Sequence, residues 1–142
     1  MSNMYIERMR TEVTELGVQE LHTPAEVDST IKSSHGTMLV YVNSVCGCAT
    51  QTARPALRKA IHSPNHPEKC VSVFAGQDIE ATSRMREYFT DEPPSSPSFA
   101  LLRDGKLVQM IHRHQILHQS PDDVVQLLED AFEKCRTEPT IA

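Results

Sequence analysis

Two hydrophobic patterns alternate along the chain: short continuous apolar runs, and apolar residues spaced three or four positions apart. The first pattern, rich in Val, Ile and Phe, predicts buried strands, and the second predicts amphipathic helices. Strands are expected at 18–21, 38–42, 70–75, 98–103 and 106–111. Helices are expected at 5–16, 24–32, 46–61, 78–89 and 121–136. Strands and helices therefore alternate over most of the chain.

Polar residues and prolines mark where several of these elements begin. Thr23, Pro24 and Glu26 predict a helix start, with Thr23 as the N-cap and Glu26 completing a capping box. Asp78 and Ser120 are expected to cap the last two helices in the same way. These signals place the helix boundaries independently of the hydrophobic pattern.

The order of the elements predicts a mixed sheet. Alternating strands and helices imply a parallel core with helices on both faces. Asp104-Gly105, between the last two strands, is the strongest hairpin signal in the chain and adds antiparallel pairing. The length of 142 residues fits one α/β domain over 1–142, with a sheet of about five strands and a C-terminal helix after the hairpin. The last residues, 137–142, are expected to be frayed.

The charge and hydrophobicity of the chain argue against several classes of function. The formal net charge is −5 and no basic block occurs, which argues against a role in binding nucleic acid or a membrane surface. No run approaches the roughly 20 apolar residues of a membrane span, and the first residues lack the apolar core of a signal peptide. We therefore expect a cytoplasmic protein. Thiols are mostly reduced there, and a close Cys pair is more often catalytic or metal-binding than structural.

The candidate chemistry lies in Cys46-Gly47-Cys48, where the strand at 38–42 passes into a helix. The free N–H groups and the dipole of a helix N-terminus stabilise an anion, so a thiolate forms there more easily. Gly47 is expected to give backbone freedom and to let another molecule approach closely, and Pro55 is expected to kink the helix. The pattern is typical of a redox-active dithiol. Two small buried hydrophobic residues beside a turn are the alternative interpretation.

Asn43 and Ser44 supply the polar groups just before the two cysteines. They are expected either to hydrogen-bond a thiolate or to satisfy the backbone of the turn. Cys70 begins a strand, and Cys135 lies on the apolar face of the last helix. Both of these cysteines are expected to be inert core residues.

Three histidines raise a second use for the thiols. His112, His114 and His118 cluster near the end of the last strand, and the first two share one face of a strand, which is ligand-like spacing. Together with Cys46 and Cys48 they could bind zinc or copper. A metal-binding module is therefore one alternative function, and a solvated strand end is the simpler fate of these histidines.

Three features together resemble the thioredoxin fold: a dithiol at a strand-to-helix junction, a helix kinked by Pro55, and Pro97 leading into the hairpin. The resemblance implies the strand order first, third, second, fourth, fifth, with the hairpin strands antiparallel to the rest. It also implies a cis peptide before Pro97, which would open the fourth strand and face the dithiol. Thioredoxins carry a buried Asp before the motif. Counting back from Cys46, that position is Val40, which argues against a carboxylate proton relay.

A narrower resemblance, to the bacilliredoxin family, runs from about residue 9 to residue 135. Its most specific motif is Cys-Gly-Cys in place of the usual Cys-x-x-Cys. The matching segments are VNSVCGCA at 42–49, FAGQD at 74–78, PPSSPS at 93–98 and LRDGK at 102–106.

Membership of this family implies a bacterial thiol–disulfide oxidoreductase or disulfide isomerase. Such proteins reduce mixed disulfides between protein cysteines and a low-molecular-weight thiol, typically bacillithiol. Cys46 matches the attacking cysteine and Cys48 its partner. The implied partners are S-thiolated or disulfide-containing client proteins, the small thiol as co-substrate, and an NADPH-dependent flavin reductase. No bound cofactor is expected, since no phosphate-binding glycine motif occurs.

The one-residue spacing of the cysteines has its own consequence. A disulfide across one residue closes a tighter ring than one across two residues, and strained disulfides are more easily reduced. The Cys46–Cys48 disulfide is therefore expected to be oxidising relative to the usual thioredoxin pair. Arg54, Arg113 and the histidines could attract the carboxylates of a small thiol. The second alternative function is a non-catalytic thioredoxin-like adaptor that merely retains the motif.

Overall fold

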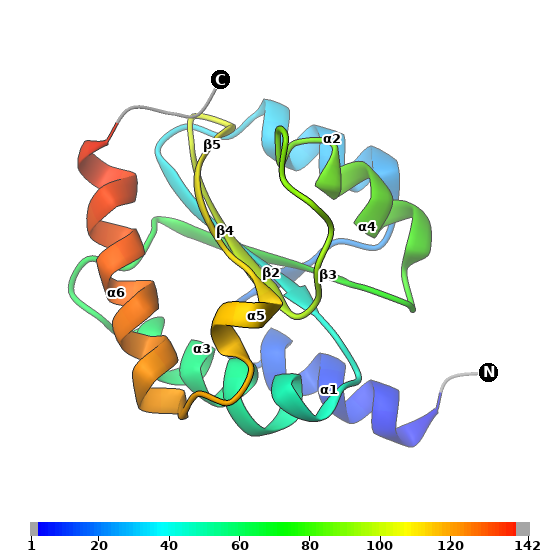
Figure 1. The fold of residues 1–142 in the computed structure, drawn as a ribbon. Helices are drawn as coiled ribbons and strands as arrows, with labels where there is room; N and C mark the ends of the chain where they lie inside the picture. The colour runs from blue at the N-terminus through cyan, green and yellow to red at the C-terminus, as the bar shows by residue number, and fades with distance from the viewer. Residues whose placement is uncertain (1–2, 139–142) are drawn as a thin grey trace.

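The computed structural model describes residues 3–138, which form a five-stranded sheet in the order β1-β3-β2-β4-β5 (Figure 1). The strands are β1 (Gln19–Glu20), β2 (Thr37–Asn43), β3 (Lys69–Phe74), β4 (Ser98–Arg103) and β5 (Lys106–Ile111). The helices are α1 (Met4–Thr14), α2 (Pro24–Lys32), α3 (Arg54–Ala60), α4 (Ile79–Arg86), α5 (Arg113–Ile116) and α6 (Pro121–Thr137), and a π-helical turn, η1 (Ala49–Ala53), precedes α3. The predicted strand order is confirmed, and α5 is an element that the sequence pattern did not predict.

The strand directions differ from the expectation at one strand. β1 and β2 both run parallel to β3, and β4 runs antiparallel to β2. β5 is antiparallel to β4 and therefore points the same way as β2. The expectation that both hairpin strands oppose the rest is wrong for β5, because a tight hairpin reverses the chain only once between its strands.

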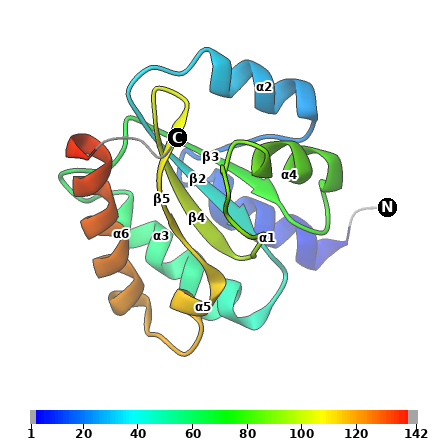
Figure 2. The same cartoon turned by 45° about the horizontal axis from the view of Figure 1, so that its top comes forward.

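Helices cover both faces of the sheet (Figure 2). Residues of α1, α3 and α6 form one apolar cluster with the sheet, and residues of α2 and α4 form the other. Leu39 and Tyr41 of β2 belong to the first cluster, whereas Met38, Val40 and Val42 belong to the second. This alternation explains why β2 appears in the sequence as a continuous apolar run, since a strand buried on both faces needs no polar side.

The hairpin turn is a two-residue connection with both residues in the left-handed region. Asp104 has φ of 53° and Gly105 has φ of 79°, as the predicted Asp-Gly turn requires. The Asp104 carboxylate also accepts the backbone N–H of Gly36 at 2.7 Å. The turn is thus tied to the loop that leads into β2.

The helix caps follow the sequence signals only in part. Thr23 Oγ1 accepts the N–H of Glu26 at 3.1 Å, as predicted, but the Glu26 carboxylate accepts the N–H of His22 at 2.7 Å. The reciprocal capping box therefore does not form at Thr23, because Glu26 reaches one residue further back. At α6 the full box is present, between Ser120 and Asp123.

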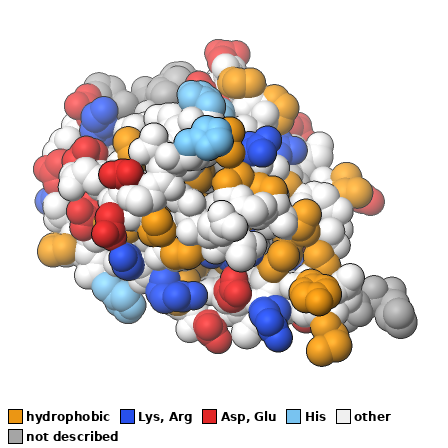
Figure 3. Space-filling model, turned by 60° about the horizontal axis from the view of Figure 1, so that its bottom comes forward, with side chains coloured by type: hydrophobic (Ala, Val, Ile, Leu, Met, Phe, Trp, Pro, Cys, Tyr) orange, Lys and Arg blue, Asp and Glu red, His pale blue; other side chains and the backbone are white. Residues whose placement is uncertain are grey.

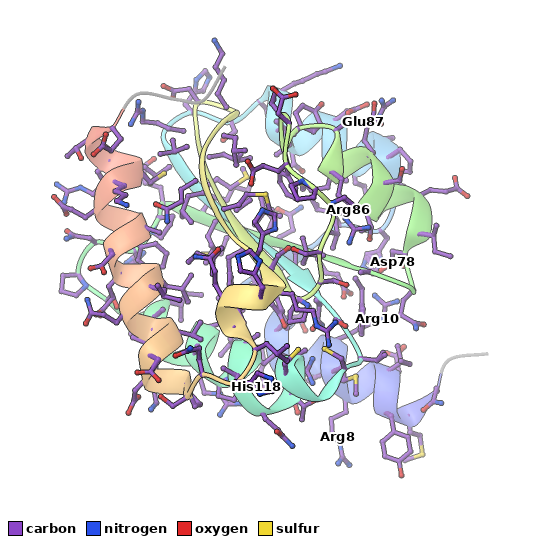
Figure 4. All side chains as sticks on the ribbon, in the orientation of Figure 1. Arg8, Arg10, Asp78, Arg86, Glu87 and His118 are labelled. Atoms are coloured by element: carbon purple, nitrogen blue, oxygen red, sulfur yellow. The ribbon has the colours of Figure 1, made fainter. Side chains whose placement is uncertain are left out.

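Asp78 precedes α4 but does not cap it with its side chain. Its carboxylate instead pairs with Arg10 of α1 at 2.7 Å, and Figure 4 shows these two side chains pointing toward each other. Arg10 also lies over the Phe74 ring, with its guanidinium carbon 5.1 Å from the ring centroid. The Asp78 carboxylate is thus used in a long-range ion pair, and the predicted cap of α4 does not form. At its other end, α4 stops at Arg86 rather than at residue 89.

The end of the chain is helical further than expected. α6 extends to Thr137, so the prediction of a frayed end is wrong at that residue, and its remaining part at 139–142 lies outside the described residues. Val124, Leu128, Ala131 and Cys135 are buried along the predicted apolar stripe of this helix. Among residues 3–138, no helix is both long and apolar enough to cross a membrane.

Candidate active site

The two cysteines lie where β2 ends, at the lower end of the sheet in Figure 1, close to α1 and α5. β2 ends at Asn43, and helical structure begins at Gly47. The Cys46 carbonyl accepts the N–H groups of Ala49 and Thr50, at 3.1 and 3.3 Å. Cys46 therefore stands at the start of the helical segment, the position that favours a thiolate.

The helix after the cysteines is interrupted before Pro55. The Arg54 N–H bonds to Ala49 O, five residues back, which makes the turn of η1 wider than an α-helical turn. Proline removes a backbone donor and crowds the preceding turn, and a widened turn accommodates both effects. A π-helical turn, rather than a regular α-helix, therefore lies between the dithiol and Pro55.

The two thiols are in direct contact. Cys46 Sγ and Cys48 Sγ are 2.9 Å apart, both cysteines are free, and both are half-buried. Burial raises the pKa of the Cys46 thiol, but hydrogen bonds from the Cys48 thiol, Ser44, and the N–H groups of Ala49 and Cys48 outweigh it and lower that pKa. Burial and the Cys46 contact raise the pKa of Cys48, against the influence of the nearby Arg113. Acidity, rather than exposure, distinguishes Cys46 as the thiolate.

The contact between the thiols can be tested by titration. Cys48→Ala removes a hydrogen bond that lowers the Cys46 pKa, so this pKa is expected to rise by roughly one unit toward the free-thiol value of about 8.5. Because alkylation needs the thiolate, the rate of Cys46 alkylation should reach its plateau at lower pH in the wild type than in Cys48→Ala. Thiolate absorbance and iodoacetamide rates measure both effects. Identical profiles would remove Cys48 from the causes of the shift.

Of the two roles expected for Ser44 and Asn43, Ser44 hydrogen-bonds at Cys46 and Asn43 satisfies the backbone of the turn. Ser44 Oγ accepts the Cys46 N–H at 3.3 Å, and its hydroxyl supports the Cys46 sulfur. Asn43 instead holds the backbone: its Oδ1 accepts the Ser44 N–H at 2.9 Å, and its Nδ2 donates to Met9 O at 3.3 Å. Ser44 thus serves the thiolate, and Asn43 serves the turn.

Gly47 does not use the backbone freedom expected of it. Its φ is outside the left-handed region, and a Cβ added there would meet nothing within 4 Å. The open space in front of Gly47 is consistent with close approach by another molecule. Val45 lies beside it with half of its surface exposed, 50%, and provides an apolar contact next to Cys46.

Pro97 follows a cis peptide bond, as the thioredoxin resemblance implies. Ser98 pairs with Val42 in the antiparallel register of β4 and β2. Pro97 therefore lies one residue further, at the level of Asn43, where β2 turns into the dithiol loop. The residue is buried at the start of β4.

α5 carries Arg113, one of the two arginines expected to attract the carboxylates of a small thiol, and places it near the dithiol. Arg113 begins this short helix, and its exposed guanidinium lies near the Cys48 thiol. The same guanidinium opposes the rise in the pKa of Cys48. The strand signal in 106–111 ended too close to Arg113 to predict a separate turn of helix.

The histidines are not arranged on a strand face. β5 ends at Ile111, and His112 is the N-cap of α5, so the prediction that His112 and His114 lie on a strand is wrong. The two rings nevertheless stack, with centroids 5.9 Å apart. The His112 ring instead bridges Ser95 Oγ and Glu92 Oε1, both at 2.7 Å. It fastens the proline-rich loop before Pro97 to the start of α5.

A metal-binding arrangement has no geometric basis in the described part of the chain. Within 3–138, no group of three or more His, Cys, Asp or Glu side chains is placed to hold a metal ion. Cys70 and Cys135 are away from the dithiol, and burial raises the pKa of each to about 11. Cys135 is fully buried and its thiol donates to Leu102 O at 3.3 Å.

Val40, the position that corresponds to the buried Asp of thioredoxins, lies on the face of the sheet that is opposite to α3. It packs there in the α2/α4 cluster. Tyr41 faces α3, and its hydroxyl is buried with no hydrogen-bond partner among the described residues. Arg54, expected to attract carboxylates from solvent, is buried at 1% exposure on the same side. On the α3 side of the sheet, the buried polar groups thus include the Tyr41 hydroxyl and the Arg54 guanidinium, rather than the carboxylate found in thioredoxins.

Comparison with known proteins agrees with this geometry. A family model described as disulphide isomerase matches residues 1–135. A bacilliredoxin of Geobacillus kaustophilus is 54% identical over 132 residues, covering 93% of this chain and 90% of that protein. A bacilliredoxin of Bacillus cereus is 51% identical over 132 residues, covering 93% and 91%.

Solved structures show the same fold at low sequence identity. A protein with a thioredoxin fold gives a TM-score of 0.61 at 14% identity, covering 89% of this chain and 99% of that one. Mitochondrial thioredoxin 3 of Saccharomyces cerevisiae gives 0.55 at 20% identity, covering 84% and 98%. The chain therefore has the thioredoxin fold and belongs to the bacilliredoxin family.

Proposed function

We propose that this protein is a thiol–disulfide oxidoreductase that removes a small thiol of the bacillithiol type from mixed disulfides on protein cysteines. The observation that carries the proposal is the dithiol geometry. Cys46 has a lowered pKa, and a second thiol lies 2.9 Å from its sulfur. Disulfide exchange requires an attacking thiolate, and the adjacent thiol adds a second, internal attacker.

The first step transfers the small thiol from the client to the protein. The Cys46 thiolate attacks the small-thiol sulfur of the mixed disulfide, a new S–S bond forms to Cys46, and the client cysteine leaves as a thiolate. A second small-thiol molecule can then attack the small-thiol sulfur of the adduct, so that Cys46 leaves as a thiolate; alternatively, Cys48 attacks the Cys46 sulfur, so that the small thiol leaves. The first route yields a symmetric small-thiol disulfide, and the second yields a Cys46–Cys48 disulfide that a reductase must reduce.

The surface around the dithiol fits a protein client of varied sequence. Figure 3 views this end of the molecule and shows hydrophobic side chains interspersed with both signs of charge. Val45 is exposed beside Cys46, and Gly47 leaves open space in front of it. An apolar contact without a dominant charge favours disulfide-containing or S-thiolated proteins as partners. We place this activity in the cytoplasm, with the small thiol as co-substrate and an NADPH-dependent flavin reductase as the source of electrons.

Disulfide isomerisation is a second candidate function. The matching family model carries the name disulphide isomerase, and Cys48 lies within reach of any disulfide formed at Cys46. An internal attacker allows escape from stalled complexes, which isomerisation needs. Reactivation of a scrambled multi-disulfide protein tests this function separately from mixed-disulfide reduction.

Mass spectrometry tests the main proposal directly. A client protein with one cysteine capped by the small thiol is incubated with reduced enzyme, and the masses of both proteins are followed. The expected result is loss of the cap from the client with appearance of the adduct or an internal disulfide on the enzyme. A client that keeps its cap at stoichiometric enzyme would reject the proposed activity.

The position of Arg113 predicts a preference for anionic small thiols. Its guanidinium is exposed and lies near enough to Cys48 to affect the pKa of that thiol, so a carboxylate on the thiol bound at Cys46 could pair with it. Arg113→Glu is expected to slow the removal of an anionic small thiol by roughly two- to fivefold at low salt, because exposed ion pairs are weak and screened. Removal of 2-mercaptoethanol, which is neutral, should change less.

Arg58→Glu provides the matched control for Arg113. Arg58 is an exposed cation in the last turn of α3, and the same charge change there should leave the ratio of anionic to neutral rates unchanged. An equal loss with both caps in Arg113→Glu would indicate damage to the dithiol rather than loss of charge recognition.

A further inference from the structure

Arg54 places a full positive charge in the interior, directly behind the dithiol loop. Its side chain is 1% exposed and begins α3. Nε donates to the Glu12 carboxylate of α1 at 2.7 Å, and one terminal nitrogen donates to Asn43 Oδ1 and Ser44 O, both at 2.9 Å. Burying a charge is costly unless it is paired and hydrogen-bonded. These contacts satisfy that condition.

A chain of hydrogen bonds leads from Arg54 to Cys46. Asn43 Oδ1, which accepts from Arg54, also accepts the Ser44 N–H. Ser44 Oγ in turn accepts the Cys46 N–H. On the other side of the dithiol, Arg54 donates to the Thr50 hydroxyl, in the turn whose N–H bonds to the Cys46 carbonyl. Arg54 therefore holds both ends of the segment that carries the two thiols.

Tyr41 shows that this charge and the thiols share one electrostatic environment. Burial raises the pKa of the Tyr41 hydroxyl strongly, the Arg54 charge opposes that rise, and negative charge on Cys46 and Cys48 adds to it. The phenol is fully buried, so these effects act with little screening by water. A cation that acts on Tyr41 from within this region also favours a thiolate at Cys46.

Glu12 is the partner that moderates this charge. Its carboxylate is 29% exposed, whereas Arg54 is buried. Because the anion of the pair lies nearer solvent, its field at the dithiol is screened more than the field of the cation. The pair thus presents a net positive potential to the loop, and that potential depends on Glu12.

We propose that Arg54 and Glu12 are a positioning pair for the dithiol: Arg54 holds the loop at 43–46 and stabilises the Cys46 thiolate from behind, and Glu12 limits that stabilisation. The inference rests on the proposed function only for the identity of Cys46 as the nucleophile. Neither residue touches the reacting sulfur atoms. Their effect is expected on the acidity of Cys46 before any substrate binds.

Removing the two charges one at a time separates this role from a structural one. Glu12→Gln leaves the Arg54 charge less balanced, so the pKa of Cys46 is expected to fall by roughly half a unit or more. Arg54→Gln removes the cation, so the same pKa is expected to rise by at least as much. A merely structural network predicts the same direction for both variants, because each weakens the contacts that hold the loop: the amide in Glu12→Gln retains an acceptor but loses the charge-assisted bond.

Thiolate absorbance against pH measures these shifts without any substrate. Burial raises the pKa of Cys70 and of Cys135 to about 11, and the pKa of Cys48 is raised as well, so the Cys46 transition is expected first as the pH rises. Glu7→Gln is the matched control, since Glu7 is exposed on α1 and the described residues give its carboxylate no partner. Its pKa profile for Cys46 should match the wild type. Circular dichroism confirms that each variant folds.

Opposite shifts in Glu12→Gln and Arg54→Gln support the proposal, and shifts in the same direction or no shift in Glu12→Gln overturn it. If Arg54→Gln does not fold, Glu12→Gln decides alone, because charge and structure predict opposite signs for it. The mixed-disulfide assay is run in parallel on the wild type. Its failure would reject the proposed function while leaving the titration result intact.

Discussion

Replacing Cys46 by alanine is expected to abolish reduction of a small-thiol mixed disulfide, with a loss of at least about a thousandfold in rate. Cys46 carries the lowered pKa and the hydrogen bonds that favour a thiolate, whereas burial and the Cys46 contact raise the pKa of Cys48. The thiolate is the nucleophile in exchange, and the remaining thiol in Cys46→Ala has neither the acidity nor the backbone N–H groups.

Cys48→Ala is expected to behave differently because a second route exists. Cys48 attacks from within at high effective concentration, but it must close a tight ring across one residue, and ring strain opposes that closure. With excess small thiol, the Cys48→Ala variant should therefore retain appreciable activity. Without it, the variant should accumulate the Cys46 adduct. Scrambled-disulfide reactivation should depend more on Cys48, because it needs the internal attacker.

Rates and masses for both single variants on one singly capped client decide between these routes. Equal losses in both variants under excess thiol would exclude the route that uses only Cys46. Activity in Cys46→Ala would instead overturn the assignment of the nucleophile. Cys70→Ala is the matched control, because Cys70 is away from the dithiol and burial raises its pKa to about 11, so its removal should not change either rate.

The elements that the sequence predicts well are those whose signals act locally. The Val-rich run that forms β2 needs burial on both faces, and both faces are covered. Asp104 and Gly105 adopt the left-handed conformations that their residue types favour. Ser120 and Pro121 begin α6 as their capping pattern indicates. In each case the residues that cause the local structure lie within a few positions of one another, so the sequence pattern is enough to predict it.

The parts that the sequence did not predict depend on contacts between distant segments. The sequence pattern suggests that Arg54 is an exposed charge on a helix, but its guanidinium is buried against Glu12, 42 residues earlier, and against Asn43 and Ser44. Asp78 has the residue type of a helix cap but pairs with Arg10, 68 residues away. The sequence pattern places His112 at the end of a strand, but in the structure its two ring nitrogens are hydrogen-bonded to Ser95 and Glu92. Such partners cannot be read from spacing along one element.

Several long-range polar contacts lie around the dithiol loop. α1 supplies Glu12, the proline-rich loop supplies the anchor for His112, and α5 supplies Arg113. The sheet fixes where Cys46 lies, groups between Ser44 and Ala49 lower its pKa, and contacts from three separate segments surround the dithiol loop. The sequence therefore predicted the order of the strands better than it predicted which residues surround the two cysteines.

Replacing Phe99 by alanine is expected to lower the free energy of unfolding by about 3–5 kcal/mol, as for other fully buried aromatic residues. Phe99 is completely buried in β4, stacks on Tyr41 with ring centroids 5.0 Å apart, and lies two residues after Pro97. Its removal leaves a cavity beneath the dithiol that the strands cannot close without breaking their register. Denaturant unfolding with linear extrapolation measures the change.

Tyr5→Ala is the control for Phe99→Ala, because it also removes an aromatic ring but from a side chain that is 71% exposed on α1. Its cost should stay within about 0.5 kcal/mol. Phe99→Leu should fall between the two, since it keeps part of the buried volume. A loss below about 1 kcal/mol in Phe99→Ala would mean that the Tyr41–Phe99 stack does not support this end of the sheet. Phe99 would then not be needed to keep water away from Tyr41 and Arg54.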